Sequence, residues 1–358
     1  MILICCSTIQ NGVHYGKGKS VSVRYEWVVT GCIHLLAACS WKKKHQKEDS
    51  LLCACALDFI RQIPGLEHAT QIDEIKRQYL KIDVLVIVDG IHIIIEDKTY
   101  TNVHGDQIAV YKDKLVKEGI SADRIRTVYY KIVEQPYTEQ VDYTFSRTEI
   151  LKLLRKYKSC ANDIFQDYLL HLEELESRSN IFNTAPITEW GFDGTRGFFA
   201  HLQKTRVDYC IESWGYVSNP SGGFMGMWFH FLDDRNDEQA LGKMGIYEYI
   251  ESIYLQFEND TAFSGDEKSA EQSSPYILAV KVHANCDYKN TRYREASKIR
   301  RALYEEFKKR VPSFQKKNFH PGQYMTVGYV PYNEKNYDAQ VSMLKSALDS
   351  IVKEWSYK

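Results

Sequence analysis

The first half of the chain alternates between helix-like and strand-like patterns of apolar residues. Two apolar runs, Ile82 to Val88 and Ile91 to Glu96, flank Asp89-Gly90, which is a strong signal for a two-residue hairpin loop. Because both runs are almost continuously apolar, we expect a central hairpin that is covered on both faces. The periodicity also predicts helices at 26–41 and 51–63, then a helix at 106–118, a strand at 127–133, and helices at 147–157 and 161–177.

The second half shows a new set of elements after a looser stretch from Asn183 to Gly197. The last predicted helix places Val341, Leu344 and Leu348 on one apolar stripe. We therefore expect two α+β units with a boundary near residue 185. The other predicted elements are strands at 209–217, 224–232, 276–283 and 324–330, and helices at 237–257 and 291–310.

Composition indicates a folded, soluble protein. Apolar residues make up 44% and charged residues 26% of the 358 positions, which is typical of globular chains. The formal net charge of −1 gives no global attraction to nucleic acid or to an anionic membrane, so any polyanion site must be a local cluster. The nine irregularly spaced cysteines contain no Cys-x-x-Cys pair, which argues against a disulfide framework and a zinc ribbon.

The apolar segments also bear on location. The longest weakly polar stretch, Trp27 to Trp41, is too short to span a bilayer and predicts a buried helix. The amino terminus lacks the basic region and the apolar length of a secretory signal. We therefore expect a cytoplasmic protein without a membrane partner.

The hairpin places two acidic residues against each other. If Asp89-Gly90 forms the loop, the numbers of paired residues sum to 179, so Asp83 lies directly opposite Glu96. Lys98 follows two residues later and shares their face of the sheet. Two opposed carboxylates suit a hard divalent cation such as Mg²⁺ or Mn²⁺, which predicts hydrolysis at phosphorus. The alternative is a polar hairpin mouth in which Lys98 neutralises one acid.

These residues resemble the signature of the PD-(D/E)XK nuclease superfamily. The pattern is Ile-Asp83, twelve residues, then Glu96-Asp97-Lys98, followed by His-Gly-Asp-Gln107-Ile-Ala-Val-Tyr111. The last segment is similar to the Gln-x-x-x-Tyr helix of the RecB-like branch. The resemblance implies an α/β (α+β) restriction-endonuclease-like core, with a mixed central sheet flanked by helices, over residues 20–182. It also implies that Asp83 and Glu96 bind the metal, that Lys98 assists the attacking water, and that Gln107 and Tyr111 face the active site.

Two further segments are similar to uncharacterised bacterial members associated with prophages and mobile elements. They are Phe145-Ser-Arg-Thr-Glu-Ile-Leu and the aromatic run from Trp214 to Trp228. This resemblance implies a role in phage defence or in mobile-element biology. Ile82 stands where the literal motif has proline, a variation that the family tolerates.

Other polar residues compete for places in the site. Many family members add an acid from the first core helix, and Glu26 is the best placed candidate, although it also fits an acid stabilised by the helix N-terminus. Asp97 points away from Glu96 and offers its backbone carbonyl. His92 lies two pairs deeper and fits a packed core histidine, and His104 fits a solvated loop.

A basic cluster in the second half predicts the substrate contact. Between Lys289 and Lys317 there are eleven basic and three acidic residues. Such a cluster can neutralise backbone phosphates, although it is also typical of a solvated helix face. We expect residues 187–358 to form a substrate-binding or specificity unit that contacts nucleic acid through Lys298, Arg300, Arg301, Lys308 and Lys309.

The sequence thus predicts a Mg²⁺-dependent nuclease, with Mn²⁺ able to substitute. DNA is favoured over RNA as the substrate because of the resemblance, and a homodimer is compatible with the sequence. Two rival hypotheses remain open: a nucleic-acid-binding module that keeps the fold without turnover, and a purely structural hairpin in an interaction protein.

Overall fold

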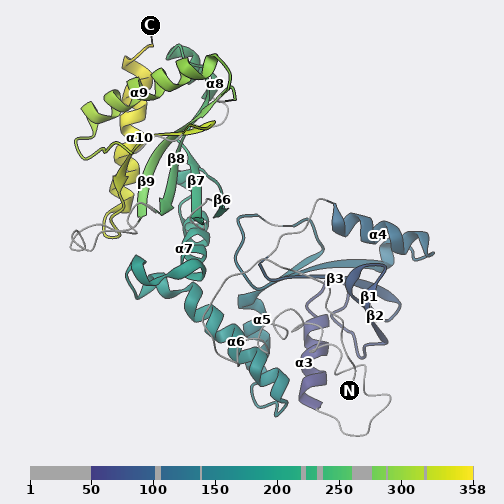
Figure 1. Ribbon diagram of the computed structural model, residues 1–358. Helices are drawn as coiled ribbons and strands as arrows, with labels where there is room; N and C mark the ends of the chain where they lie inside the picture. Colours follow the sequence, from purple (N-terminus) through teal and green to yellow (C-terminus); the bar gives the residue numbers. More distant parts are fainter. Residues whose placement is uncertain are drawn as a thin grey trace. The chain divides into compact units, whose positions relative to one another are not determined.

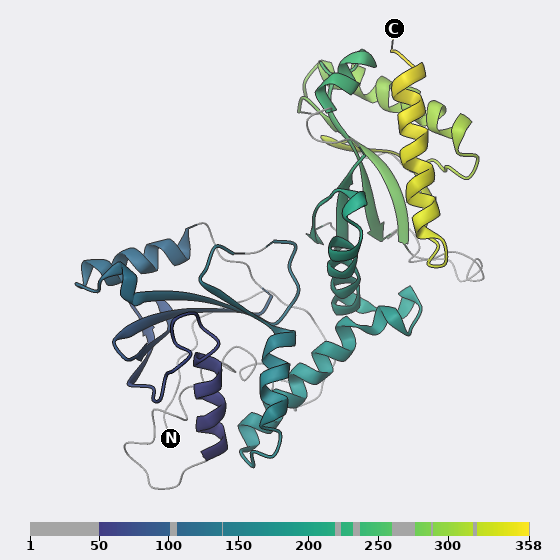
Figure 2. The same ribbon diagram turned by 180° about the vertical axis from the view of Figure 1, so that it is seen from behind.

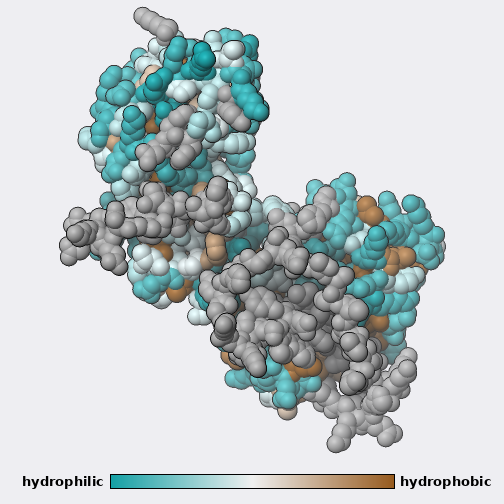
Figure 3. Space-filling view, in the orientation of Figure 1, coloured by the Kyte–Doolittle hydropathy of each residue, from teal (hydrophilic) through white to brown (hydrophobic). Residues whose placement is uncertain are grey.

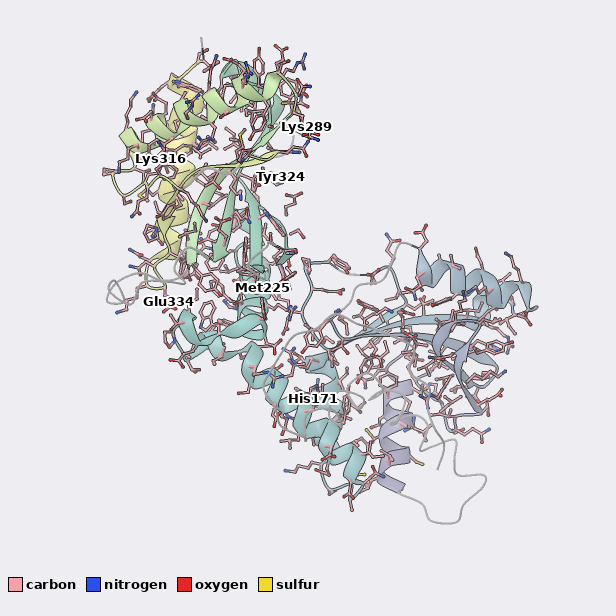
Figure 4. All side chains as sticks on the ribbon, viewed as in Figure 1. His171, Met225, Lys289, Lys316, Tyr324 and Glu334 are labelled. Atoms are coloured by element: carbon pink, nitrogen blue, oxygen red, sulfur yellow. The ribbon has the colours of Figure 1, made fainter. Side chains whose placement is uncertain are left out.

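The computed structural model describes residues 50–100, 106–137, 139–218, 223–231, 237–259, 276–287, 289–317 and 321–357. These residues form two compact units. Unit 1 takes the described residues up to Ile132 and those from Val141 to His171, and unit 2 takes Val133–Gln140 and the residues from Leu172 onward. The division falls inside helix α6 (Asp163–Ser179), and His171 marks it in Figure 4.

Unit 1 is built on a five-stranded mixed sheet in the order β1-β2-β3-β4-β5. The first three strands are antiparallel, whereas β4 and β5 run parallel to their neighbours. Helix α4 covers one face of the sheet, and α3 and α5 lie on the other face (Figure 1). The bounds are α3 Ser50–Ile60, β1 Glu74–Tyr79, β2 Ile82–Val88, β3 Ile91–Lys98, α4 Gln107–Lys117, β4 Ile125–Lys131, β5 Tyr143–Ser146 and α5 Arg147–Lys156.

The predicted central hairpin is confirmed. Val84 pairs with Ile95 and Val88 with Ile91, so the numbers of paired residues sum to 179 as expected. On the α4 face, Ile94 packs against Tyr111 of α4. On the opposite face, the rings of Phe59 (α3) and Phe145 (β5) stack with their centroids 3.9 Å apart. Both faces are therefore covered, which explains why the strands are almost continuously apolar.

Unit 2 is a five-stranded antiparallel sheet in the order β10-β9-β8-β7-β6. Helices α7, α9 and α10 contribute their apolar residues to one large core with the sheet (Figures 1 and 2). The bounds are α7 Gly191–Thr205, β6 Ile211–Val217, β7 Phe224–His230, α8 Asp237–Lys243, β8 Ile250–Asn259, β9 Tyr276–Ala284, α9 Arg292–Arg310, β10 Tyr324–Pro331 and α10 Tyr337–Glu354. The mixed sheet with flanking helices and the second α+β unit confirm the predicted fold class.

Short 3₁₀ helices connect the larger elements. One precedes β4, two follow α6, and one precedes β6. Their bounds are η2 Ala122–Arg124, η3 Ile181–Asn183, η4 Ile187–Glu189 and η5 Val207–Tyr209.

The predicted helix at 237–257 is wrong over most of its length. Helix α8 ends at Lys243, and Gly245, with φ of +71°, turns the chain out of the helix. The following residues form strand β8, whose core-facing Ile253, Leu255 and Phe257 alternate with residues of the other sheet face. This alternation has the period of a strand and not of a helix, and β8 pairs with a neighbouring strand on each side.

Three further elements of the structure carry no clear pattern in the sequence. Strand β1 lies at a sheet edge and has no buried residue, so its sequence carries little apolar signal. Strand β5 is only four residues long. Helix α7 contains Gly191, Gly194 and Gly197, which resemble a loop in composition. A side chain at Gly197 would collide with the Ser179 carbonyl oxygen, so close helix packing explains this glycine.

Hydrophilic residues predominate on the described surface of each unit in the view of Figure 3, with apolar side chains scattered among them. Within the described ranges, no helix combines the length and the hydropathy needed to cross a lipid bilayer. The predicted helix at 26–41 lies outside the described residues.

Candidate active site

The candidate site centres on Glu96, near the end of the buried strand β3. Its side chain is completely buried, and its Oε1 atom receives two hydrogen bonds. The Lys98 ammonium donates from 2.6 Å, and the Gln107 amide donates from 2.9 Å. The second oxygen, Oε2, is buried and has no hydrogen-bond partner in the described part of the chain. One carboxylate oxygen is thus held in place while the other is left to accept a ligand.

Asp83 lies beside this carboxylate at the start of β2. The paired residues of β2 and β3 end at Val84 and Ile95, which directly adjoin Asp83 and Glu96 in the chain. The Asp83 Oδ2 atom accepts a hydrogen bond from the backbone N–H of Asp97 at 3.3 Å. This bond ties the start of β2 to the end of β3, so the two acids share one edge of the sheet.

Helix α4 brings two more polar groups to the same face. Gln107 begins the helix, and its amide also donates to the Tyr111 hydroxyl at 2.6 Å. Tyr111 is buried, and its ring packs against Ile94 of β3, which fixes the helix over the acids. The structure therefore joins Lys98, Glu96, Gln107 and Tyr111 in one hydrogen-bonded network.

Burial and neighbouring charges shift the pKa values in this network. Burial raises the pKa of the Glu96 carboxyl, and the Asp83 carboxylate raises it further, against the opposing hydrogen bond from Lys98. Burial opposes the charge on Lys98, but the Glu96 carboxylate outweighs this and raises the pKa of the ammonium. Burial also raises the pKa of Asp97 well above its ordinary value, and Asp83 adds to that rise. Carboxylates crowded in this way are stabilised by a cation.

The donor set fits a hard divalent cation. Asp83 and Glu96 supply carboxylate oxygens, and the buried Glu96 Oε2 atom is the observation that calls for a ligand. No group of three or more His, Cys, Asp or Glu side chains among the described residues is arranged to hold a metal. The expected third acid, Glu26, and the loop residue His104 lie outside the described residues.

Two lysines near the site were missed by the sequence analysis. The Lys114 ammonium donates to the Leu80 carbonyl oxygen at 2.9 Å and lies 5.0 Å from the centre of the Tyr111 ring. Its position three residues after Tyr111 on the same helix face could have indicated this. Lys131 is buried and pairs in register with Lys98 at the ends of β4 and β3.

His92 lies at the other end of β3 from the acids. It pairs in register with Ile87 of β2 and Ile125 of β4. Its ring is half-buried, and burial lowers the pKa of the imidazole. The histidine therefore has the position of a packing residue and not that of a metal ligand at the carboxylates.

The basic cluster of α9 is largely engaged within unit 2. Lys298 pairs with Glu295 at 2.9 Å, and Lys309 pairs with Glu306 at 2.6 Å. Arg301 is exposed. Lys289 precedes the helix and Lys316 follows it, so the cluster extends beyond both helix ends (Figure 4).

Two of the predicted contact residues do not lie free on that surface. Arg300 is 4% exposed, and its guanidinium donates to the Thr326 carbonyl oxygen at 3.1 Å. Lys308 donates to the carbonyl oxygens of Pro312 and Phe314 beyond the helix end. Arg300 belongs to the interior because α9 packs that side against the sheet, a relation that helical spacing alone does not reveal.

The two tryptophans at the ends of the aromatic run differ in position. Trp214 is buried in the core of unit 2, and its indole N–H donates to Gln203 at 2.9 Å. Trp228 is only partly buried, and its register places it on the sheet face opposite the core. Trp214 therefore has a packing position, as most strand aromatics do.

Comparison with known proteins identifies one family. Residues 27–187 match the family model described as PD-(D/E)XK nuclease superfamily. No curated protein and no solved structure matches the chain.

Proposed function

We propose that this chain is a divalent-metal-dependent nuclease that hydrolyses phosphodiester bonds, because residues 27–187 match the model of the PD-(D/E)XK nuclease superfamily. The observation that carries the proposal is the Glu96 carboxylate. Lys98 and Gln107 hold one of its oxygens, and the other oxygen is buried without a partner beside Asp83. A metal ligand in a nuclease needs this combination of fixed orientation and open coordination.

Nucleases of this superfamily generally use divalent metal ions, and Asp83 and Glu96 are the described residues that would hold one. We propose Mg²⁺, with Mn²⁺ able to substitute, and Glu26 as a third ligand. When bound, such an ion acidifies a water molecule and polarises a phosphoryl oxygen.

The chain's own residues support this chemistry by orientation and charge. The Lys98 ammonium opposes the rise that burial causes in the pKa of Glu96, and it can orient the attacking water or offset the charge that develops on the phosphate. Gln107 fixes the rotation of the Glu96 carboxylate, and the Tyr111 hydroxyl fixes Gln107 in turn. Gln107 and Tyr111 are therefore proposed as positioning residues.

The substrate proposed is nucleic acid, with DNA favoured over RNA. The catalytic domain is assigned to residues 20–182 and the substrate-binding unit to residues 187–358. Within that unit, Arg301, Lys298 and Lys309 are the exposed cations of α9 that support a phosphate contact. A role in phage defence or mobile-element biology, and a homodimeric state, are compatible with this activity.

A cleavage assay with matched variants tests the proposal. The purified chain is incubated with single- and double-stranded DNA and RNA in Mg²⁺, in Mn²⁺ or in EDTA. We expect metal-dependent cleavage by the parent and loss of cleavage in Lys98→Ala and Glu96→Gln. Each change removes about 3 kcal/mol of transition-state stabilisation.

Lys152→Ala provides the control, because this exposed lysine of α5 lies outside the network. It should cleave like the parent. Retained cleavage in Lys98→Ala or Glu96→Gln would reject the site. A folded parent that binds nucleic acid without cleaving it in either metal would favour the rival binding module.

A further inference from the structure

The turn between β1 and β2 has an unusual backbone for its residues. Tyr79 pairs with Ile82, so Leu80 and Lys81 form a two-residue loop. Both have left-handed backbone angles, with φ of +54° and +70°, and Gln78 just before them has φ of +50°. Residues with a Cβ atom disfavour this region, so three such residues within four positions form a strained segment.

The next loop of the same sheet provides an internal comparison. Asp89 and Gly90 join β2 to β3 with the same loop length, and their φ values are +50° and +74°. Asp-Gly is a preferred pair for a loop with two left-handed residues, whereas Leu-Lys is not. Leu80 packs against the core under α4, which accounts for its own place in the turn, but the φ of +70° at the exposed Lys81 is not explained by residue preference or by packing. Strain of this kind is often retained where a side chain has a function.

The strained turn lies beside the candidate carboxylates. Lys81 precedes Asp83 by two residues and is exposed, and among the described side chains it has no hydrogen-bond or ion-pair partner. The Leu80 carbonyl oxygen is held by the Lys114 ammonium of α4, which also lies over the Tyr111 ring. The turn is therefore anchored to the same helix that carries Gln107 and Tyr111.

The charge around the site favours a cation at this place. Asp83 and Glu96 are two carboxyl groups at one sheet edge, and Lys98 forms an ion pair with Glu96. An approaching polyanion is repelled by such an edge unless exposed cations flank it. Lys81 is an exposed cation next to that edge.

We propose that Lys81 binds a backbone phosphate of the nucleic-acid strand that enters the candidate active site, and that the strained β1–β2 turn positions its ammonium for this contact. The inference rests on the proposed function in taking nucleic acid as the ligand, but it requires binding only and no cleavage. The alternative is that Lys81 is a solvated lysine on an incidental turn.

Salt dependence of binding tests the interaction. Labelled duplex and single-stranded DNA are titrated with the full chain in EDTA at several salt concentrations, with Lys81→Gln, Lys81→Arg and Arg77→Gln as variants. Removal of one phosphate-binding cation should reduce the slope of log affinity against log salt by about 0.9 for a duplex and about 0.7 for a single strand. Lys81→Arg keeps the charge and should keep the parent slope.

Arg77→Gln is the matched control. Arg77 lies in β1 and, like Lys81, is an exposed cation. Its pairing with Val84 places it on the sheet face away from Asp83. It should retain the parent slope. Three results would overturn the assignment. Lys81→Gln could keep the salt slope of the parent, Arg77→Gln could reduce that slope by the same amount, or the parent could show no measurable salt-dependent binding.

A turn replacement separates strain from charge. Lys81→Gly places glycine at the φ of +70° and leaves the packing of Leu80 against the core intact, so the variant should melt at a higher temperature than the parent and show the same reduction in slope as Lys81→Gln. A lower melting temperature would overturn the claim that the turn is strained.

These results are independent of catalysis. If the parent does not cleave in Mg²⁺ but Lys81→Gln lowers the slope, the phosphate contact stands and the nuclease proposal fails. If Lys98→Ala abolishes cleavage but Lys81→Gln keeps the parent slope, the nuclease proposal stands and the Lys81 assignment fails.

Discussion

Glu96 and Asp83 are the residues on which the candidate site depends, and their environment explains why the chain keeps two acids together. A completely buried carboxylate beside a second acid destabilises a fold unless a partner compensates it. Lys98 compensates part of this charge, and the unpartnered Glu96 Oε2 atom indicates that the compensation from the described residues is incomplete. We therefore expect the two carboxylates to lower the stability of the metal-free protein and to provide its affinity for a metal ion.

Substituting Asp83 by Asn should separate these two effects. Asn keeps the size and a carbonyl oxygen that can accept from the Asp97 N–H, but it removes one of the opposed charges. In EDTA the variant should be as stable as the parent, or more stable by up to about 1 kcal/mol. The rise in melting temperature that Mg²⁺ or Mn²⁺ gives the parent should shrink, because that rise measures binding to the folded state.

Melting curves in EDTA and in excess metal provide the measurement, with Asp113→Asn of α4 as the control, because Asp113 has no part in the network around Glu96. Asp113→Asn should keep the full metal-induced shift. If Asp83→Asn melts well below the parent in EDTA, or keeps the full shift, then Asp83 has a structural partner and is not a metal ligand.

Individual elements show where local preference and packing disagree. Helix α7 contains glycine at positions where alanine is the better helix former by about 1 kcal/mol. Gly197→Ala should nevertheless destabilise the protein by about 2 kcal/mol or more, because the new Cβ atom collides with the Ser179 backbone. Gly242→Ala in α8 has open space around the new atom and should stabilise by about 0.5–1 kcal/mol.

Denaturant unfolding of both variants measures this contrast. Opposite signs are expected from two glycine-to-alanine changes within helices of the same unit. A neutral or stabilising Gly197→Ala would show that α7 does not pack as closely against Ser179 as the structure describes.

Helix α9 illustrates how acidic neighbours engage a basic cluster. Hydrogen bonds from Lys309, and also from Arg310, lower the pKa of Glu306 below its ordinary value of 4.5. A lowered carboxyl pKa in the folded state contributes stability that is present above the ordinary value and is lost as the pH falls through the folded pKa. Glu306→Gln should therefore lower stability near neutral pH, by less than about 1 kcal/mol for partly exposed pairs.

The difference between Glu306→Gln and the parent should shrink as the pH falls below 4.5 and disappear below the lowered pKa of the folded state, because the parent carboxyl is then neutral like the glutamine of the variant. Melting temperatures across this range test the sign. Glu305→Gln is the control, since Glu305 lies on the same helix and is not paired with Lys309 or Arg310, and it should show little difference at any pH. If the melting temperature of Glu306→Gln fell further below that of the parent as the pH decreased, the pairing of Glu306 with Lys309 and Arg310 would be contradicted.

At the scale of the whole molecule, the proposed division of labour assigns catalysis to the first half and phosphate binding to the second. The triple variant Lys298→Gln, Arg301→Gln and Lys309→Gln removes exposed cations of α9 and leaves the buried Arg300 in place. If this helix binds nucleic acid, affinity should fall and the salt slope should drop by about 0.9 for each duplex phosphate that the variant no longer neutralises. The same titrations in EDTA measure it, and a parent slope would leave α9 as a solvated, internally paired helix.

The sequence by itself determined the centre of the candidate site. A two-residue loop at Asp89-Gly90 fixes the register of the hairpin, and alternation along the strands then fixes which side chains share a face. The placement of Asp83, Glu96 and Lys98 on one face therefore followed from local geometry, whereas Gln107 and Tyr111 were placed at the site by the resemblance to the nuclease superfamily. Local rules are sufficient for that face because its three residues lie within one short stretch of the chain, from Asp83 to Lys98.

Only the tertiary structure decided which charges are free and which segments pair. Arg300 and Lys308 belong to a basic run in the sequence, but packing of α9 buries the first and the chain beyond the helix end engages the second. The two strands that pair with residues 250–259 are likewise decided only in the folded sheet. Lys114 joins the site through a backbone carbonyl 34 residues away. Each of these outcomes depends on the distance between segments that are separated in sequence, which no local pattern encodes.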